Sequence, residues 1–193
     1  MKKKLFAVIL TLALACVAVG CGKKEDDTKT KIQKDIVTFV NESLPAISAD
    51  RDVAIAIYNT YFTAEDIDLQ SFLGELQETA IPYMEIYIVN LTAVETQTDE
   101  VAALKDLYLQ CAQKQCDAMK MVASAIEEEN PEFLTQAEAM ITEATSYLNQ
   151  YESELRLLAI DNDITINGTF NSSPNTSADQ GASDTTGNAG IIE

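Results

Sequence analysis

The sequence predicts an all-α protein, an antiparallel up-down bundle of four long helices followed by a disordered C-terminal tail. Between residues 30 and 166, apolar residues recur at alternating spacings of four and three, which is typical of helices packed in a left-handed bundle. The four periodic segments are joined by short connections, and short connections make successive helices antiparallel neighbours. Residues 167–193 are rich in Ser, Thr, Asn, Gly and Asp, with almost nothing to bury, so we expect them to be disordered.

The first 20 residues have the pattern of a secretory signal peptide. Three lysines precede an apolar run from Leu5 to Val19, and small residues follow as far as Cys21. The run is shorter than the roughly 20 apolar residues of a membrane-spanning helix. Ala18-Val19-Gly20-Cys21 resembles the lipobox of bacterial lipoproteins. This resemblance implies that residues 1–20 are removed and that Cys21 becomes the lipidated first residue.

Two alternatives remain open at this end of the chain. Cys16 is the other candidate for lipidation, but the chain becomes charged directly after Cys21 and not after Cys16. An uncleaved N-terminal anchor is the second alternative. In the preferred interpretation a diacylglyceryl group fastens the protein to the outer face of the cytoplasmic membrane. Residues 21–29 are then the lipidated cysteine and a polar linker, and residues 30–166 are the helical domain.

The first helix is predicted from an apolar series between residues 30 and 61. Its members are Ile32, Ile36, Phe39, Val40, Leu44, Ile47, Ala54, Tyr58 and Tyr61. Pro45 interrupts this series, and a proline inside a helix lacks an N–H donor and clashes with the preceding turn. We therefore expect a kink or a break in the helix at Pro45.

The second helix is predicted from Leu69 to Val94. Its start resembles a capping box, because Thr63 is followed three residues later by Asp66. Pro82 lies on the side of the helix away from its apolar stripe. A bend at that position would wrap the helix around the core.

The third and fourth helices have the clearest apolar spacing. The third series is Val101, Leu104, Tyr108, Cys111, Gln115, Ala118, Val122 and Ala125. The fourth series is Ala137, Ile141, Ala144, Leu148, Tyr151, Leu155 and Leu158. We expect Thr96 or Thr98 to cap the third helix and Asn130, followed by Pro131, to cap the fourth. Asn162 is expected to end the fourth helix in the left-handed conformation.

The charge and the missing residue types exclude several classes of function. The chain has 31 acidic and 13 basic side chains and a formal net charge of −18, and losing the three lysines of residues 1–20 leaves about −21. This excess of acid argues against nucleic-acid binding. The chain has no histidine, which removes the usual general base and the usual metal ligand. We therefore expect no catalytic residue, no metal site and no cofactor.

Cys111 and Cys116 would be the two unmodified cysteines of the processed chain. On one continuous helix they lie about 140° apart around the axis, with Cα atoms roughly 8–9 Å apart. This separation exceeds the ~7 Å limit for a disulfide. We therefore predict no bridge between them.

Five polar or aromatic residues are candidates for ligand binding. Gln115 occupies an apolar position of the third helix, where a buried amide needs partners. It either sets the register of the bundle or contacts a ligand. Tyr58, Tyr83, Tyr87 and Tyr151 belong to pairs spaced three or four residues apart, so each pair shares one helix face. If several converge they line an apolar pocket with hydroxyl tips, and ordinary core packing is the alternative.

The layout as a whole resembles that of small helical-bundle lipoproteins of Gram-positive bacteria. The matching features are Cys21-Gly22-Lys23-Lys24, the proline-interrupted first helix, Ile81-Pro82-Tyr83 and the last helix with Tyr151-Glu152. The resemblance implies a location and a fold, and of the functional residues it implies the role of Cys21 alone.

The sequence therefore predicts a membrane-anchored, non-catalytic binding or scaffold module outside the cytoplasm. Its partner would be an envelope protein or a small ligand, in addition to the membrane that holds its diacylglyceryl cysteine. Two alternatives remain open. One is a carboxylate- or metal-dependent component of an envelope enzyme, and the other is a purely structural spacer.

Overall fold

The computed structural model describes residues 13–15, 25–63 and 66–167, and these residues are helical apart from one short pair of strands. Cys21 and the predicted tail beyond residue 167 lie outside the described residues. The elements in chain order are β1 (Ala13–Ala15), α1 (Glu25–Thr38), η1 (Phe39–Ser43), α2 (Leu44–Thr63), α3 (Leu69–Glu75), η2 (Leu76–Ala80), α4 (Ile81–Ala93), α5 (Asp99–Glu127), α6 (Glu132–Asp161) and β2 (Thr165–Asn167).

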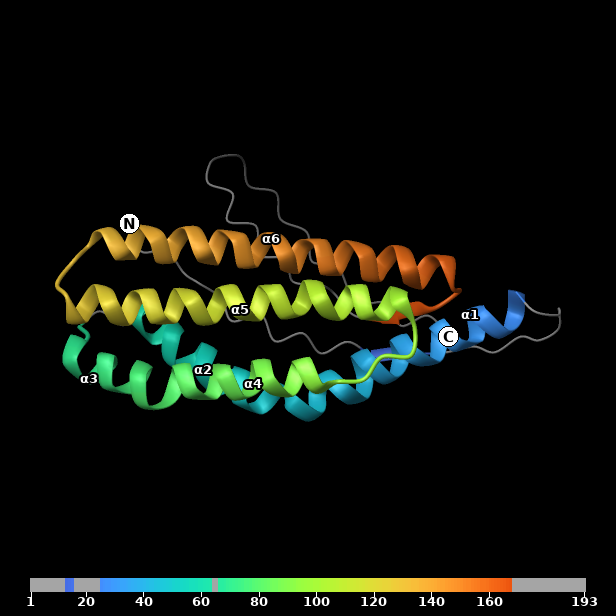
Figure 1. Ribbon diagram of the computed structural model, residues 1–193, viewed down its shortest axis with the longest axis horizontal. Helices are drawn as coiled ribbons and strands as arrows, with labels where there is room; N and C mark the ends of the chain where they lie inside the picture. Colours follow the sequence, from blue (N-terminus) through green and yellow to red (C-terminus); the bar gives the residue numbers. More distant parts are fainter. Residues whose placement is uncertain (1–12, 16–24, 64–65, 168–193) are drawn as a thin grey trace, which may run out of the picture.

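Four long helical segments make up the described part of the chain, which confirms the predicted all-helical class. The first is α1–η1–α2, the second is α3–η2–α4, and the third and fourth are α5 and α6. Figure 1 shows α5 between α6 and α4, with α5 and α6 side by side along their length. α2 packs on α4, whereas α2 and α6 share few close contacts within the described residues. α5 is therefore the central helix.

Both prolines inside helices come just after a π-helical segment of five residues. At the end of η1 the Leu44 N–H donates to the Phe39 carbonyl, five residues earlier, and Pro45 follows directly. A proline cannot bond the carbonyl four residues before it and clashes with that group. The wider π turn provides room for the ring. The helix therefore does not break at Pro45, which was one of the two predicted outcomes, and η2 precedes Pro82 in the same way.

The hydrophobic core lies mainly along α5. Every residue of its predicted apolar series is buried except Gln115, which is half-buried. In α6 the buried members of the predicted series are Ala137, Ala144, Tyr151 and Leu155. The other three members are half-buried. The difference agrees with the packing, because α5 has helices on two sides and α6 has α5 as its main helical neighbour.

Two predicted helix caps are present. The Thr98 hydroxyl accepts a hydrogen bond from the Val101 N–H at 3.4 Å and caps α5. The Asn130 side chain accepts from the Glu132 N–H at 3.1 Å at the start of α6. Each cap satisfies one of the backbone donors that a helix leaves free at its first turn.

Two other predictions about helix ends are wrong. Thr63 is the last residue of α2, and the cap of α3 is Asp68, whose carboxylate accepts from the Gln70 N–H at 3.0 Å. At the end of α6, Asn162 has a φ of −108° and Asp163 takes the left-handed conformation with a φ of 53°. Aspartate tolerates this region because its short side chain bonds locally to the backbone.

Buried polar contacts join three helical segments at one end of the molecule. Asp35 of α1 is 4% exposed, and its carboxylate accepts from the Gln97 N–H at 2.8 Å and from the Thr98 hydroxyl at 2.7 Å. The Gln33 amide donates to the Asn162 carbonyl at 2.6 Å. α1 is therefore bonded both to the loop that precedes α5 and to the end of α6.

The short strands and the N-terminal boundary differ from a pure bundle. β1 pairs antiparallel with β2, and Leu14 lies opposite Ile166. α1 begins at Glu25, inside the segment 21–29 that the sequence predicts as a linker. Within the described ranges no helix is both long and apolar enough to cross a membrane.

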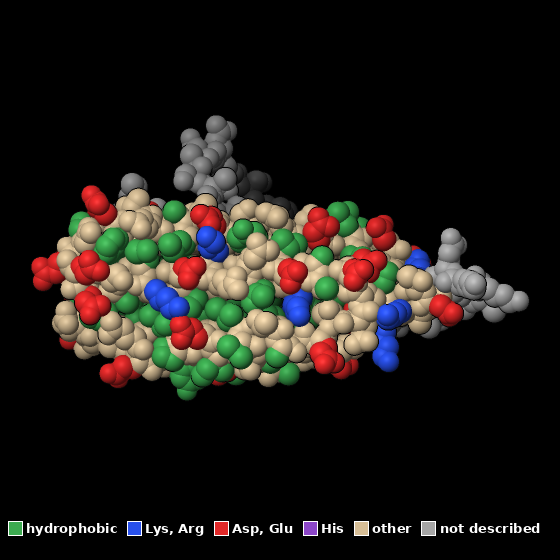
Figure 2. All heavy atoms as spheres, viewed as in Figure 1, with side chains coloured by type: hydrophobic (Ala, Val, Ile, Leu, Met, Phe, Trp, Pro, Cys, Tyr) green, Lys and Arg blue, Asp and Glu red, His purple; other side chains and the backbone are tan. Residues whose placement is uncertain are grey.

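The surface in view is acidic, with Lys and Arg side chains scattered among the carboxylates (Figure 2). Lys114 pairs with Glu143 at 2.6 Å between α5 and α6, and Lys120 pairs with Glu85 at 2.7 Å between α5 and α4. Exposed pairs of this kind contribute little to stability. The interior therefore holds the arrangement together, and the charges chiefly keep the surface hydrated.

Candidate functional site

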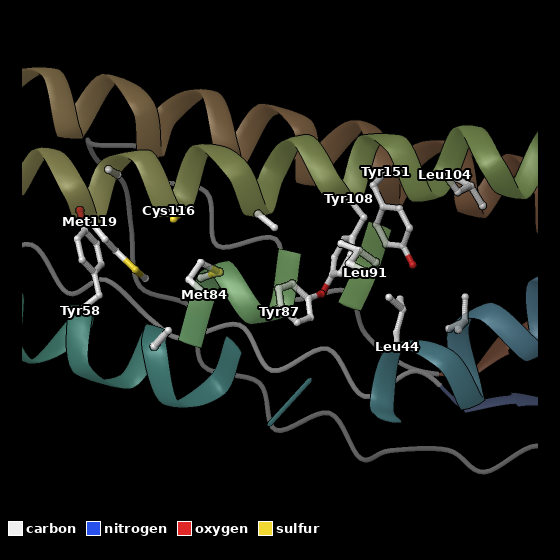
Figure 3. Close-up of a cluster of buried hydrophobic side chains, with 14 of the residues drawn as sticks. Leu44, Tyr58, Met84, Tyr87, Leu91, Leu104, Tyr108, Cys116, Met119 and Tyr151 are labelled. Carbon is white, nitrogen blue, oxygen red and sulfur yellow. The ribbon is translucent and has the colours of Figure 1, made fainter. Parts of the chain in front are cut away.

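Three tyrosines from three helices meet in the core (Figure 3). The rings of Tyr108 on α5 and Tyr151 on α6 are tilted, with centroids 4.9 Å apart. The hydroxyl groups of Tyr87 on α4 and Tyr108 lie within hydrogen-bonding reach of each other. All three side chains are buried. Two of the four candidate tyrosines, Tyr87 and Tyr151, therefore lie on either side of Tyr108 in the packed core.

Arg51 reaches this region from α2. Its Nη2 donates a hydrogen bond to Gln115 Oε1 at 3.2 Å, and its Cζ lies 5.9 Å from the centroid of the Tyr108 ring. That distance is within the range of a cation–π interaction. The side chain is half-buried, and none of the ion pairs among the described residues involves it. The guanidinium thus faces a neutral amide and an aromatic ring.

The surroundings of Arg51 keep it charged. Burial lowers the pKa of the guanidinium, while the electrostatic effect of Tyr108, Tyr87, Cys111 and Asp52 raises it, and the net pKa is raised. An arginine in any case stays protonated at physiological pH. Arg51, Tyr87, Tyr108, Cys111 and Gln115 form what we call the Arg51 cluster. This cluster carries one permanent positive charge.

The thiol and hydroxyl groups here are neutral at physiological pH. Burial raises the pKa of Cys111 to about 11, with the charge of Arg51 acting in the opposite direction and Glu152 adding to the rise. Burial also raises the pKa of Tyr87 and of Tyr151 above the usual value for tyrosine. These three groups therefore keep their protons in the folded protein. They are neither a thiolate nucleophile nor a general base.

The Tyr151 hydroxyl is a buried polar group without a hydrogen bond, and one carboxylate oxygen of the adjacent Glu152 is another among the described residues. Tyr151 is 0% exposed, and its hydroxyl has no hydrogen-bond partner in the described part of the chain. In Figure 3 this hydroxyl points away from Tyr87. A buried hydroxyl without a partner loses its hydration and gains nothing in return, which destabilises the folded state.

The cysteines of α5 are free, as the spacing argument predicts. Cys111 and Cys116 are both buried, and no bridge joins them. Burial also raises the pKa of Cys116. Neither thiol is exposed or activated for chemistry.

The structure brings three of the five candidate ligand-binding residues together. Gln115 and Tyr87 belong to the Arg51 cluster, and Tyr151 packs on Tyr108. Tyr58 is buried but lies seven residues beyond Arg51 on α2, about 10 Å along the axis, and is well separated from the cluster in Figure 3. Tyr83 is 39% exposed on the outer side of α4. Cys21, the predicted lipidation site, lies outside the described residues.

Sequence reasoning missed Arg51 as a site residue, although a signal was present. In the apolar series of the first helix, the interval from Ile47 to Ala54 leaves one step empty. Arg51 fills it, four residues after Ile47 and three before Ala54. Arg51 is therefore a charged residue at an interior position of its helix, as Gln115 is an amide at an interior position of α5.

An open surface pocket of about 450 Å³ lies elsewhere, between the first turns of α1 and α5. Its lining includes Lys31, Gln97, Asp99 and Glu100, and none of the candidate residues contributes to it. Within the described ranges no group of three or more Cys, Asp and Glu side chains is arranged to hold a metal ion.

Comparison of the chain with models of protein families, with curated proteins and with solved structures finds no match. The function is therefore argued from the residues, their geometry and the chemistry that they allow.

Proposed function

We propose that this protein is a lipid-anchored binding module of the cell envelope, with no catalytic activity of its own. Residues 1–20 are a signal peptide that is removed, and Cys21 carries a diacylglyceryl group that holds the chain at the outer face of the cytoplasmic membrane. The helical domain then displays a binding site for a small ligand or for another envelope component. The observation that carries the binding role is the half-buried Arg51, which contacts Gln115 and has no carboxylate partner among the described residues.

The proposed lipid anchor at Cys21 lies close in sequence to the start of the first helix. Three residues lie between Cys21 and Glu25, where α1 begins, and the four Cα-to-Cα steps of a fully extended chain span at most ~14 Å. The end of α6 lies at the same end of the molecule, because Lys29 of α1 pairs with Asp163 at 2.6 Å. A lipid on Cys21 would therefore keep the start of α1 and the end of α6 close to the membrane. Cleavage would also remove β1 and its pairing with β2.

We also infer that the four helical segments form an up-down bundle. α5 and α6 pack along their length and are joined by residues 128–131, so the chain reverses between them. Residues 94–98 reverse it between α4 and α5 in the same way. The few close contacts between α2 and α6 support a bundle that is less tightly closed on that side.

Binding is favoured over catalysis by the protonation of the Arg51 cluster. Its thiol and Tyr87 hydroxyl keep their protons at neutral pH, and its one ion is a guanidinium that cannot act as a base. Such groups recognise and orient a ligand by donating hydrogen bonds. A structural spacer is the second candidate, and the length of the helices, up to 30 residues in α6, favours it.

Metabolic labelling tests the anchor. Cells that express the full chain are fed an alkyne fatty acid, and the purified protein is examined for the label. We expect labelling of the wild type and of Cys16→Ala, and none of Cys21→Ala. Labelling that persists in Cys21→Ala, or an unlabelled wild type, contradicts the anchor.

A thermal-shift screen tests the binding role. The full-length protein, purified from membranes in a nonionic detergent, is heated with metal ions, peptides, cell-wall fragments, lipids and small organic acids. A ligand present at 100 times its Kd stabilises the folded state by about 2.7 kcal/mol. If no compound raises the melting temperature, the spacer is the better description.

A further inference from the structure

The guanidinium of Arg51 has unused binding capacity. A guanidinium carries five N–H donors, and among the described residues Gln115 Oε1 is the one hydrogen-bond acceptor that it meets. Buried charges in proteins are normally paired with an opposite charge. None of the ion pairs between described residues involves this half-buried cation, although the chain has 31 acidic side chains. The arrangement leaves guanidinium donors for an anion that the described residues do not supply.

The charge of the site selects a monoanion. Arg51 contributes the single positive charge of the cluster, and the Tyr87 hydroxyl and the Cys111 thiol keep their protons at physiological pH. The charge of Asp52, the next residue of α2, acts on the guanidinium and further disfavours an anion of higher charge. The protein as a whole has a formal charge of −18, which repels multiply charged anions. The planar fork of a guanidinium matches a carboxylate through two parallel hydrogen bonds. A monocarboxylate is therefore the best match for the charge and for the donor geometry.

The flanks of Arg51 are apolar. Ile47 and Ile55 lie four residues before and four residues after Arg51, so the three side chains share one face of α2. Both isoleucines are half-buried and pack against the core. α2 and α6 share few close contacts in the described ranges, so this side of the domain is not tightly covered by the last helix. A ligand whose carboxylate meets Arg51 would lay an apolar body against these isoleucines.

We propose that the protein binds a small monocarboxylate with an apolar or aromatic body, whose carboxylate is held by Arg51 beside Gln115. This inference rests on the proposed binding function and names the ligand class of that site. Tyr108 supports the guanidinium through its ring face, and the Tyr87 hydroxyl lies within hydrogen-bonding reach of the Tyr108 hydroxyl. Gln115 fixes one edge of the guanidinium and leaves the remaining donors for the ligand.

The first test is a variant that places a carboxylate of the protein itself next to Arg51. In Gln115→Glu a carboxylate replaces the amide whose oxygen lies 3.2 Å from Arg51 Nη2, so it pairs with the guanidinium and competes with the ligand. We expect a higher melting temperature than that of the wild type and at least tenfold weaker binding of benzoate. Gln113→Glu is the matched control, because Gln113 is exposed on the same helix. It should leave benzoate binding unchanged.

Titration of the full-length protein in nonionic detergent is the second test, with benzoate as the probe and its neutral relative benzamide as the comparison. We expect saturable heat with benzoate, at least tenfold weaker binding of benzamide, and at least tenfold weaker binding of benzoate to Arg51→Gln. Benzoate that binds no more tightly than benzamide, or that binds Arg51→Gln as well as the wild type, overturns the proposal. If Arg51→Gln does not fold, the titration of benzoate into Gln115→Glu and Gln113→Glu tests the proposal instead. Equal binding of benzoate to these two variants then overturns it.

The two levels of the proposal fail separately. If the screen yields a ligand whose affinity is the same in the wild type and in Gln115→Glu, the binding module stands and the monocarboxylate site is refuted. If neither benzoate nor any compound of the screen binds, both the site and the binding function are refuted, and the spacer remains.

Discussion

Replacing Tyr151 with phenylalanine should stabilise the protein. The Tyr151 hydroxyl is fully buried and has no hydrogen-bond partner in the described residues. The substitution removes this oxygen and keeps the ring that packs 4.9 Å from the ring of Tyr108. Removal of a tyrosine hydroxyl usually destabilises a protein, because most buried hydroxyls are bonded. The sign expected here is the opposite.

The size of the effect follows from the cost of burying an unsatisfied polar group. Mutational data place this cost at about 1–3 kcal/mol. Phenylalanine leaves almost no cavity, so most of the cost is recovered, and we expect the free energy of unfolding to rise by about 1–2 kcal/mol. For a chain of this length each kcal/mol raises Tm by about 2–4 °C, which corresponds to about 2–8 °C in total.

Thermal unfolding of the full-length protein in nonionic detergent, followed by far-ultraviolet circular dichroism, measures the shift. Tyr87→Phe is the matched control, because it removes a hydroxyl that lies within reach of the Tyr108 hydroxyl. It should lower the free energy of unfolding by about 1 kcal/mol. A Tyr151→Phe protein less stable than the wild type refutes the reasoning, as do two variants that shift in the same direction.

Two further predictions concern buried groups away from the ring of Tyr151. Asp35→Ala removes the acceptor of two hydrogen bonds and should lower the free energy of unfolding in urea by about 2–4 kcal/mol. Asp106→Ala, at an exposed position of α5, should change it by no more than about 0.5 kcal/mol, and equal losses would contradict the role of Asp35. The Cys111 thiol ionises near its ordinary pKa of 9.0 when unfolded and at about 11 when folded. The unfolded state therefore loses its proton first, so stability should fall as pH rises from about 9 to about 11. In urea titrations at successive pH values, the free energy of unfolding of Cys111→Ala should fall less steeply over this range than that of the wild type. An equal dependence on pH in the two proteins would show that Cys111 is not responsible.

The helices themselves follow closely from the apolar spacing. All the apolar members of the α5 series are buried, because a 4-3 spacing puts them on one side of any helix, whatever lies opposite. Thr98 and Asn130 were also predictable as caps, since the cap is a contact between residues two or three positions apart. Local chemistry is sufficient for both features.

The predictions that differ from the structure concern the cap of α3 and the break expected at Pro45. Threonine and aspartate are both residue types that cap helices. Asp68 caps α3, because α2 extends as far as Thr63. At Pro45 the rule that proline breaks a helix holds for a regular α-helix. The five-residue π segment η1 places the preceding carbonyls differently, and the helix continues.

The candidate site was predictable in part. Gln115 stood out because an amide occupied an apolar position, and the same test applied to the first helix would have selected Arg51. The contact between the two residues was not predictable, since 64 residues separate them. Tyr58 and Tyr83 have the same local spacing as Tyr87, yet Tyr58 is well separated from the Arg51 cluster in Figure 3 and Tyr83 is exposed on α4.

The sequence alone determined the helical class, the four helical segments of the described chain and the buried side of α5. Each of these depends on which side chains share a helix face, and that is set by the geometry of a single helix. The tertiary structure decided that Arg51 meets Gln115 and Tyr108 and that Tyr151 is buried without a partner. It also decided that Tyr58 and Tyr83 lie outside the Arg51 cluster. Those outcomes depend on how far each helix is shifted and rotated against its neighbours, which is settled by packing between residues far apart in the chain.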